Sequence, residues 1–156
     1  DLSWQTAFQT KDESAVEDYC RRAFIDFEWR EGGRLRTRQV RPATAIHPQT
    51  GEALWFNQAH LFHTSSLEPS LREALLAVVR EEDLPRNAFY GDGTPIETSI
   101  LDEIRGVYQS AAVAFPWREG DVLMLDNMLT AHGRTSFKGP RKVLVAMAET
   151  LSNHNS

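Results

Sequence analysis

The densest run of polar side chains in an apolar setting spans residues 126–134 and contains His132. This histidine follows the apolar run 122–125, and Arg141 comes nine positions later, directly before a second apolar run, 143–148. If both runs are strands, an imidazole and a guanidinium lie at the ends of neighbouring strands. Neutral imidazole is a common iron and zinc ligand, and a planar guanidinium binds a carboxylate through two charge-assisted hydrogen bonds. The pattern predicts a metal with a carboxylate ligand; the alternative is a hydrogen-bonded core histidine and a surface arginine.

Two further cations lie beside this pair. Arg134 stands two residues after His132 and is predicted either to contact substrate or cosubstrate in the same cavity or to form a structural ion pair. Lys142 follows Arg141, and strand alternation lets only one of the two face the cavity. We prefer Arg141, because its guanidinium has the bidentate donor geometry that a carboxylate requires.

His60 and His63 form a second pair of histidines, three positions apart. In an extended strand such positions face opposite sides, so the two rings could not chelate one metal ion without a bend in the chain. The alternative is a pair of ordinary histidines at the end of a strand.

Three amphipathic helices are predicted where apolar residues recur at helical spacing. They cover residues 12–24, 69–82 and 99–108. Asp12 is available as the N-cap of the first helix, and Cys20 on its apolar stripe is expected to pack in the core. Pro69 stands where a first helical turn tolerates proline, and Ser70 with Glu73 resembles a capping box.

Four segments have the composition of strands. They cover residues 34–40, 53–57, 122–125 and 143–148. The first alternates with period two and carries the basic face Arg34, Arg36 and Arg38, which is either solvated or a surface for an acidic partner such as a carrier protein. A turn at 47–52 precedes the second strand, and together these features indicate a hairpin. The last two are apolar throughout, as strands buried on both faces are.

Length and pattern together indicate the fold class. A chain of 156 residues with 41% hydrophobic and 25% charged residues is predicted to fold as one domain, residues 1–156. Strands with inserted helices, and a loop rich in glycine and aspartate at 87–95, favour a mainly β architecture of the α+β type. A β-sandwich or jelly roll fits this order better than regular βαβ alternation.

Charge and composition limit the possible partners. The 17 basic and 22 acidic residues leave a formal charge of −5, which argues against nucleic acid or an anionic membrane as the main partner. One cysteine cannot form an internal disulfide, and no apolar run approaches the length needed to span a bilayer. A cytoplasmic protein is therefore expected.

Several strings of residues resemble the taurine dioxygenase family, and within it the branch associated with peptide-antibiotic biosynthesis. The strings are 47–52, 55–60, 115–127, 131–134 and 139–147. They extend over nearly the whole chain and are similar to the C-terminal part of that family's domain. The resemblance implies a double-stranded β-helix (jelly roll) and an oxygenase that uses Fe(II), 2-oxoglutarate and O₂.

The same resemblance implies roles for individual residues. His132 is implied to be an iron ligand, and Arg141 to bind the distal carboxylate of 2-oxoglutarate, with Arg134 as a second cofactor-binding candidate. His60, on the strand after the turn, and the nearby Asn57 match substrate-facing positions. The implied reaction hydroxylates an unactivated carbon of an amino acid, either free or tethered to a carrier protein.

The family's second motif, His-x-Asp/Glu, is not found in this sequence. Two positions after the five histidines stand non-acidic residues, namely Gln49, Phe62, Ser65, Arg134 and Ser156. The family places this motif upstream of the region matched here, so the expectation is the C-terminal portion of the oxygenase domain and an incomplete jelly roll. A second hypothesis is a catalytically inactive fragment that binds its missing half or another copy through open strand edges, which predicts a homo-oligomer.

Overall fold

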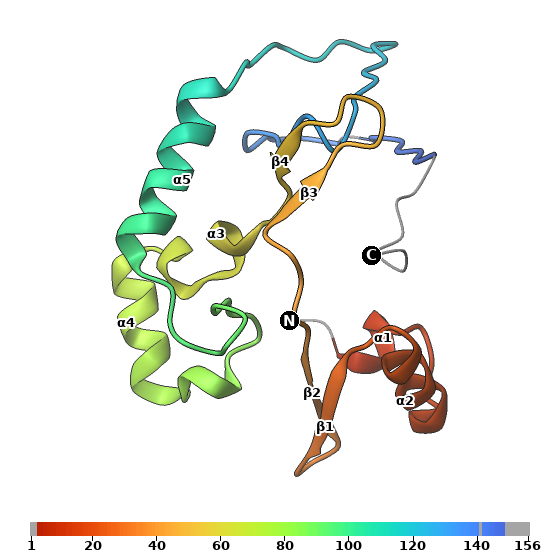
Figure 1. Ribbon diagram of the computed structural model, residues 1–156, viewed down its shortest axis with the longest axis vertical. Helices are drawn as coiled ribbons and strands as arrows, with labels where there is room; N and C mark the ends of the chain where they lie inside the picture. The colour runs from red at the N-terminus through yellow and green to blue at the C-terminus, as the bar shows by residue number, and fades with distance from the viewer. Residues whose placement is uncertain (1–2, 141, 149–156) are drawn as a thin grey trace. The chain divides into compact units, whose positions relative to one another are not determined.

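The computed structural model describes residues 3–140 and 142–148 (Figure 1). The chain divides into two compact units, Asp1–Met124 and Leu125–Ser156. All helices and strands of the described residues lie in the first unit. In chain order they are α1 (Trp4–Ala7), α2 (Glu13–Arg22), β1 (Asp26–Arg30), β2 (Arg34–Arg38), β3 (Thr44–Ile46), β4 (Ala53–Trp55), α3 (Ala59–Phe62), the 3₁₀ turn η1 (Thr64–Ser66), α4 (Pro69–Val78), the 3₁₀ turn η2 (Glu81–Asp83) and α5 (Thr98–Ala111).

Helix α2 confirms the first predicted helix and its cap. The Asp12 side chain accepts a hydrogen bond of 3.0 Å from the Ser14 amide, which satisfies one of the open N–H groups of the first turn. Val16 and Cys20 lie one turn apart on the inner face and are 1% and 0% exposed. Burial of Cys20 agrees with the prediction that it packs in the core.

The core of this region is small and rich in aromatic residues. Val16, Cys20 and Ile25 are buried at its centre. Partly buried hydrophobic residues surround them, namely Trp4, Phe8, Ala23, Phe27, Trp29 and Leu35. The Trp4 and Trp29 rings meet edge to face at 5.2 Å, and the Trp4 indole donates to the Gly33 carbonyl at 2.9 Å. These contacts tie α1 to the hairpin that follows α2.

The antiparallel pair β1 and β2 has one apolar and one charged face. Trp29 lies opposite Leu35, and the next pair on that face is Phe27 with Thr37. The other face carries only charged pairs, namely Asp26 with Arg38, Glu28 with Arg36, and Arg30 with Arg34. The period of two predicted over 34–40 is therefore confirmed over β2, with its arginine face exposed, and its partner is the strand before it in the chain.

A second hairpin, β3 with β4, closes over the predicted turn. The His47 ring accepts hydrogen bonds from the Gln49 and Thr50 amides at 3.3 and 3.0 Å, and Gly51 takes φ +74°, a region that glycine adopts without steric cost. The first strand of this hairpin is Thr44–Ile46, not the segment 34–40, of which residues 34–38 already pair with β1.

Two details of the later helices differ from the sequence prediction. Helix α4 ends at Val78 rather than near 82. Val78 and Val79 are two consecutive β-branched residues, and the backbone of Val79 is extended. Its cap is Glu68, which accepts from the Ser70 and Leu71 amides at 3.1 and 3.2 Å, and not a box of Ser70 and Glu73. The third predicted helix is confirmed as the longer α5.

The two apolar runs predicted as buried strands are neither strands nor buried. In 122–125 and the described residues 143–148, Val122 and Met124 are 93% and 94% exposed, and Leu144 is 83% exposed. A strand exists only when its backbone groups pair with a neighbouring strand. Within the described ranges these segments have no such partner, so apolar composition alone did not produce a strand.

The jelly roll is likewise not seen. A jelly roll has eight strands in two sheets, whereas residues 3–140 and 142–148 form two sheets of two strands each. The segment 87–95 is a loop as predicted, with Phe89 and Pro95 joined by one isolated bridge. In the described part of the chain, no helix has the length and apolar character needed to cross a membrane.

Candidate functional site

The residues predicted to hold iron and 2-oxoglutarate fall in the second unit. His132 and Arg134 are exposed there, and Arg141 lies outside the described residues. The Arg134 guanidinium lies over the Phe137 ring, 5.2 Å from its centre, which is a cation–π contact. In this structure, Arg134 therefore contacts a residue only three positions later in the chain.

A turn built on Asp126 precedes His132. The Asp126 carboxylate accepts from the Met128 and Leu129 amides at 2.9 and 3.2 Å, and the Thr130 hydroxyl donates to the Asp126 carbonyl at 2.6 Å. Each of these bonds joins residues at most four positions apart. The turn therefore orders the approach to His132 through local contacts.

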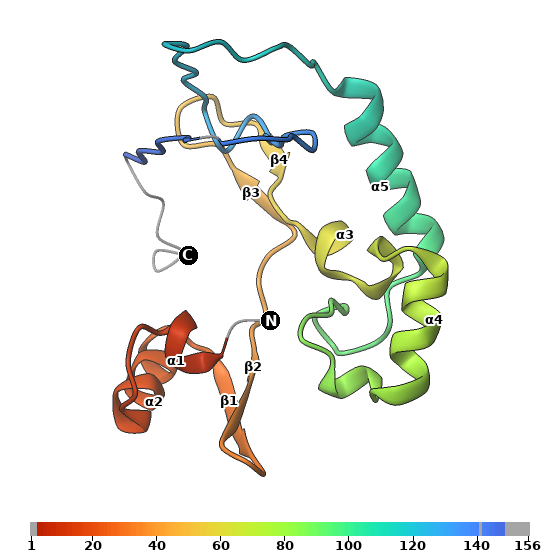
Figure 2. The same cartoon turned by 180° about the vertical axis from the view of Figure 1, so that it is seen from behind.

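His60 and Asn57, the predicted substrate-binding residues, lie close together in the first unit. His60 lies on the short helix α3, which corrects its predicted placement on a strand. The Asn57 side chain accepts a 2.6 Å hydrogen bond from the Ala59 amide and so turns the chain into this helix. Helix α3 lies beside α5 (Figure 2), and His60 on α3 is 5% exposed.

Arg105 on α5 holds this region together. Its guanidinium donates twice to the His60 carbonyl, at 2.7 and 3.1 Å, and once to the Ser65 hydroxyl at 2.8 Å. The remaining terminal nitrogen forms an ion pair of 2.6 Å with Asp102, one turn earlier on α5. One side chain thus links α5 to α3 and η1, whose bonded residues lie 45 and 40 positions earlier in the sequence.

The environment of His60 favours a neutral ring. Its imidazole stacks on Tyr108 at 4.6 Å with an interplanar angle of 20°, and its Nδ1 is buried without a hydrogen-bond partner among the described residues. Burial, and next the charge of Arg105, lower the pKa of His60. A neutral, buried imidazole is suited to accepting a hydrogen bond or to packing.

His63 is the C-cap of α3 and is also buried, at 6% exposure. Its Nδ1 accepts from the Ser65 amide at 3.1 Å and lies 2.9 Å from the Ser65 hydroxyl. Burial lowers the pKa of His63, and the Arg72 guanidinium lowers it further. Because Nδ1 serves the backbone of η1, this histidine has a structural role.

These residues do not assemble a metal site by themselves. Over 3–140 and 142–148, no group of three or more His, Cys, Asp or Glu side chains is placed to hold a metal ion. An iron site of the two-histidine, one-carboxylate type needs three such donors. His132 can supply one of them, so the described residues do not fit a complete iron centre.

Sequence reasoning missed the contacts of Arg105 and the stacking of Tyr108 on His60. The signal was the face of α5 on which Leu101, Ile104, Arg105 and Tyr108 share helical spacing. An arginine within an apolar stripe indicates a buried polar contact. Its partners, however, lie far away in the sequence and could not be read from the stripe.

Comparison with known proteins identifies the class. Residues 4–147 match the family described as taurine catabolism dioxygenase TauD, TfdA family, and the chain belongs to that family. This confirms the resemblance seen in the sequence. The description of that family names dioxygenases, and the match does not favour the alternative of a fragment that only binds.

Two relatives are similar to the chain over nearly all of its length. It is 48% identical over 151 residues to the dapdiamide synthesis protein DdaC of Enterobacter agglomerans, covering 97% of this chain and 46% of that protein. It is 28% identical over 148 residues to a clavaminate synthase-like protein of Arabidopsis thaliana, covering 94% of this chain and 41% of that protein. The chain therefore spans less than half the length of either relative.

Proposed function

We propose that this chain is part of a dioxygenase that depends on Fe(II) and 2-oxoglutarate and hydroxylates a small amino-acid-like substrate, free or tethered to a carrier protein. The family match over residues 4–147 carries this proposal. Similarity to a dapdiamide synthesis protein supports a reaction in the biosynthesis of a peptide-like antibiotic.

Within this proposal His132 supplies one iron ligand. Because the described residues do not provide three grouped donors, the other ligands would come from outside them. Arg141 binds the distal carboxylate of 2-oxoglutarate, because a guanidinium matches a carboxylate with two parallel hydrogen bonds. Arg134, which here lies over Phe137, is the second candidate for contact with the cosubstrate.

His60 and Asn57 are proposed to face the substrate. They adjoin in the turn that leads into α3, and the lowered pKa of His60 keeps its ring neutral at physiological pH. The neutral ring has an acceptor, Nδ1, without a hydrogen-bond partner among the described residues. Because this atom is buried, binding of a substrate N–H or O–H group there requires a movement of α3.

The first test replaces the proposed ligand in a protein that carries this chain and has iron-dependent turnover. His132→Ala should abolish substrate-dependent conversion of 2-oxoglutarate to succinate, because a three-donor site loses one donor. His154→Ala is the matched control, a histidine of the same chain outside the motif. Undiminished succinate formation in His132→Ala would contradict the assignment.

A second variant tests the cosubstrate anchor. Arg141→Met should raise the apparent Michaelis constant for 2-oxoglutarate by about 100-fold, since removing one member of a buried charge pair costs about 3 kcal/mol or more. Lys142→Met is the neighbouring control and should leave that constant unchanged. If Lys142→Met has the larger effect, the cavity-facing residue is the lysine.

A further inference from the structure

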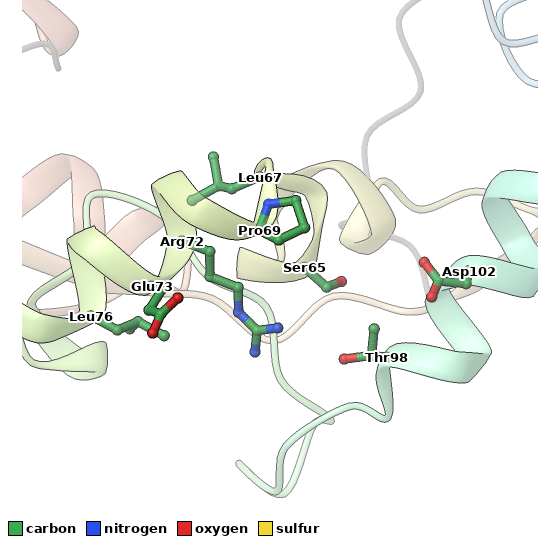
Figure 3. A pocket seen from close by; sticks show the side chains of 8 residues that line it. All are labelled: Ser65, Leu67, Pro69, Arg72, Glu73, Leu76, Thr98 and Asp102. Carbon is green, nitrogen blue, oxygen red and sulfur yellow. The ribbon is translucent and has the colours of Figure 1, made fainter.

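A cleft of about 540 Å³ lies between α4, the turn η1 and the start of α5 (Figure 3). Its lining includes the side chains of Ser65, Arg72, Glu73 and Thr98, and none of the residues assigned above to iron or 2-oxoglutarate. Leu67 and Leu76 give it apolar walls. It thus combines a hydrophobic surface with a few polar groups, as small-molecule sites do.

Arg72 lines this cleft and forms no ion pair with any described residue. Among the described residues its guanidinium makes no hydrogen bond or ion pair, and its Nε is buried without a partner. Figure 3 shows its terminal nitrogens pointing into the cleft toward the hydroxyl side chains of Ser65 and Thr98. A partly buried charge that lacks an acceptor is costly, and a bound carboxylate would supply two acceptors at once.

The neighbouring cation is already engaged. The Arg105 guanidinium donates hydrogen bonds to the His60 carbonyl, the Ser65 hydroxyl and the Asp102 carboxylate. Asp102, which also lines the cleft, is paired with it at 2.6 Å. Arg72 is therefore the side chain through which this cleft can bind an anionic group.

Glu73 places the opposite charge beside Arg72. It is the next residue on α4, lines the same cleft, is exposed, and forms no ion pair within the described part of the chain. A simple anion bound to Arg72 would be repelled by Glu73, and a simple cation bound to Glu73 would be repelled by Arg72. A ligand that carries both charges, on two groups joined to one carbon atom, avoids both penalties.

We propose that this cleft binds a small zwitterion of the α-amino-acid class. The carboxylate of the ligand lies on Arg72, its ammonium group on Glu73, and its apolar side chain against Leu67 and Leu76. The site needs neither iron nor 2-oxoglutarate, so the inference does not rest on the proposed reaction.

The test is a titration of the isotope-labelled 156-residue chain with L-leucine, observed through backbone amide resonances. L-Leucine should shift the amides of Ser65, Glu73 and Thr98. Two probes each lack one charge, namely 4-methylpentanoate and 3-methylbutylamine, and each should bind about tenfold more weakly or worse, since a hydrogen bond to a charged group contributes about that factor. Absence of shifts with L-leucine would overturn the proposal, as would equal binding of 4-methylpentanoate or tighter binding of 2-oxoglutarate.

Two variants separate the two charges. Arg72→Gln should abolish the L-leucine shifts, whereas Arg36→Gln, an exposed arginine on β2, should not alter them. Glu73→Gln should weaken L-leucine binding and leave 4-methylpentanoate binding as strong or stronger. L-Leucine shifts that persist in folded Arg72→Gln would refute the site. If Arg72→Gln does not fold, the exposed Glu73→Gln variant decides, and unchanged L-leucine binding there refutes it.

Discussion

The surroundings of His60 and of His132 differ in how far the supporting contacts reach along the chain. His60 is buried, stacks on Tyr108, and has its backbone carbonyl held by Arg105 from 45 positions away. His132 is exposed and follows a turn that Asp126 stabilises through bonds to residues at most four positions later. The histidine with the stronger family assignment thus follows a turn held by local bonds, and the weaker candidate lies in a tertiary network.

The largest difference in unfolding free energy should come from a leucine-to-alanine substitution made once in the first unit and once in the second. Leu101→Ala removes a side chain that is 1% exposed and should lower the free energy of unfolding by about 2–5 kcal/mol. Leu144→Ala removes one that is 83% exposed and should change it by less than about 0.5 kcal/mol. Urea unfolding followed by tryptophan fluorescence measures both. A large loss in Leu144→Ala would mean that this segment is packed in solution and would break the comparison.

A smaller difference is expected between two arginines. Arg105→Met removes charged hydrogen bonds to two elements and should cost about 1.5–3 kcal/mol of unfolding free energy. Arg134→Met removes one exposed cation–π contact and should cost about 0.5–1 kcal/mol. Urea unfolding gives both values. A larger loss in Arg134→Met than in Arg105→Met would show that Arg134 makes a stronger contact than the one to Phe137.

The smallest effect concerns pH. The pKa of His63 is lowered in the folded state, chiefly by burial, so below its usual value of 6.5 the unfolded chain binds a proton that the folded chain does not. The contribution of His63 to the free energy of unfolding should therefore be constant above about pH 6.5 and fall as the pH drops below it. His63→Asn keeps an acceptor for the Ser65 amide and should make this fall shallower, whereas His132→Gln is the matched exposed variant. An unchanged slope in His63→Asn would show that its protonation is not linked to folding.

Local patterns predicted the helices because helical hydrogen bonds close within four residues. Helix α2 begins at its expected cap, Asp12, and α5 follows its apolar stripe. The strands depended on partners. Residues 34–38 pair with β1, the strand directly before them across the turn at Gly32 and Gly33. The segments 122–125 and 143–148 pair with no strand in the described part of the chain.

For the site, the sequence predicted the family and the residues that match its motifs, and nothing beyond them. The motif around His132 indicated the family, which the comparison confirmed. The roles of His132, Arg134 and Arg141 and the expected self-association stay predictions. Arg105 and Arg72 could not be found in this way, because the partners of the one and the cleft of the other are produced by packing between α3, α4 and α5.

The burial of Cys20 makes the chain's one cysteine a chemical reporter. Its thiol is 0% exposed, and burial raises its pKa, so in the closed state it is poorly accessible and weakly nucleophilic. A thiol-specific reagent can react only when α2 lifts from the β1–β2 hairpin. At saturating reagent, where labelling outpaces reclosing, the labelling rate therefore measures how often this small core opens, without any engineered probe.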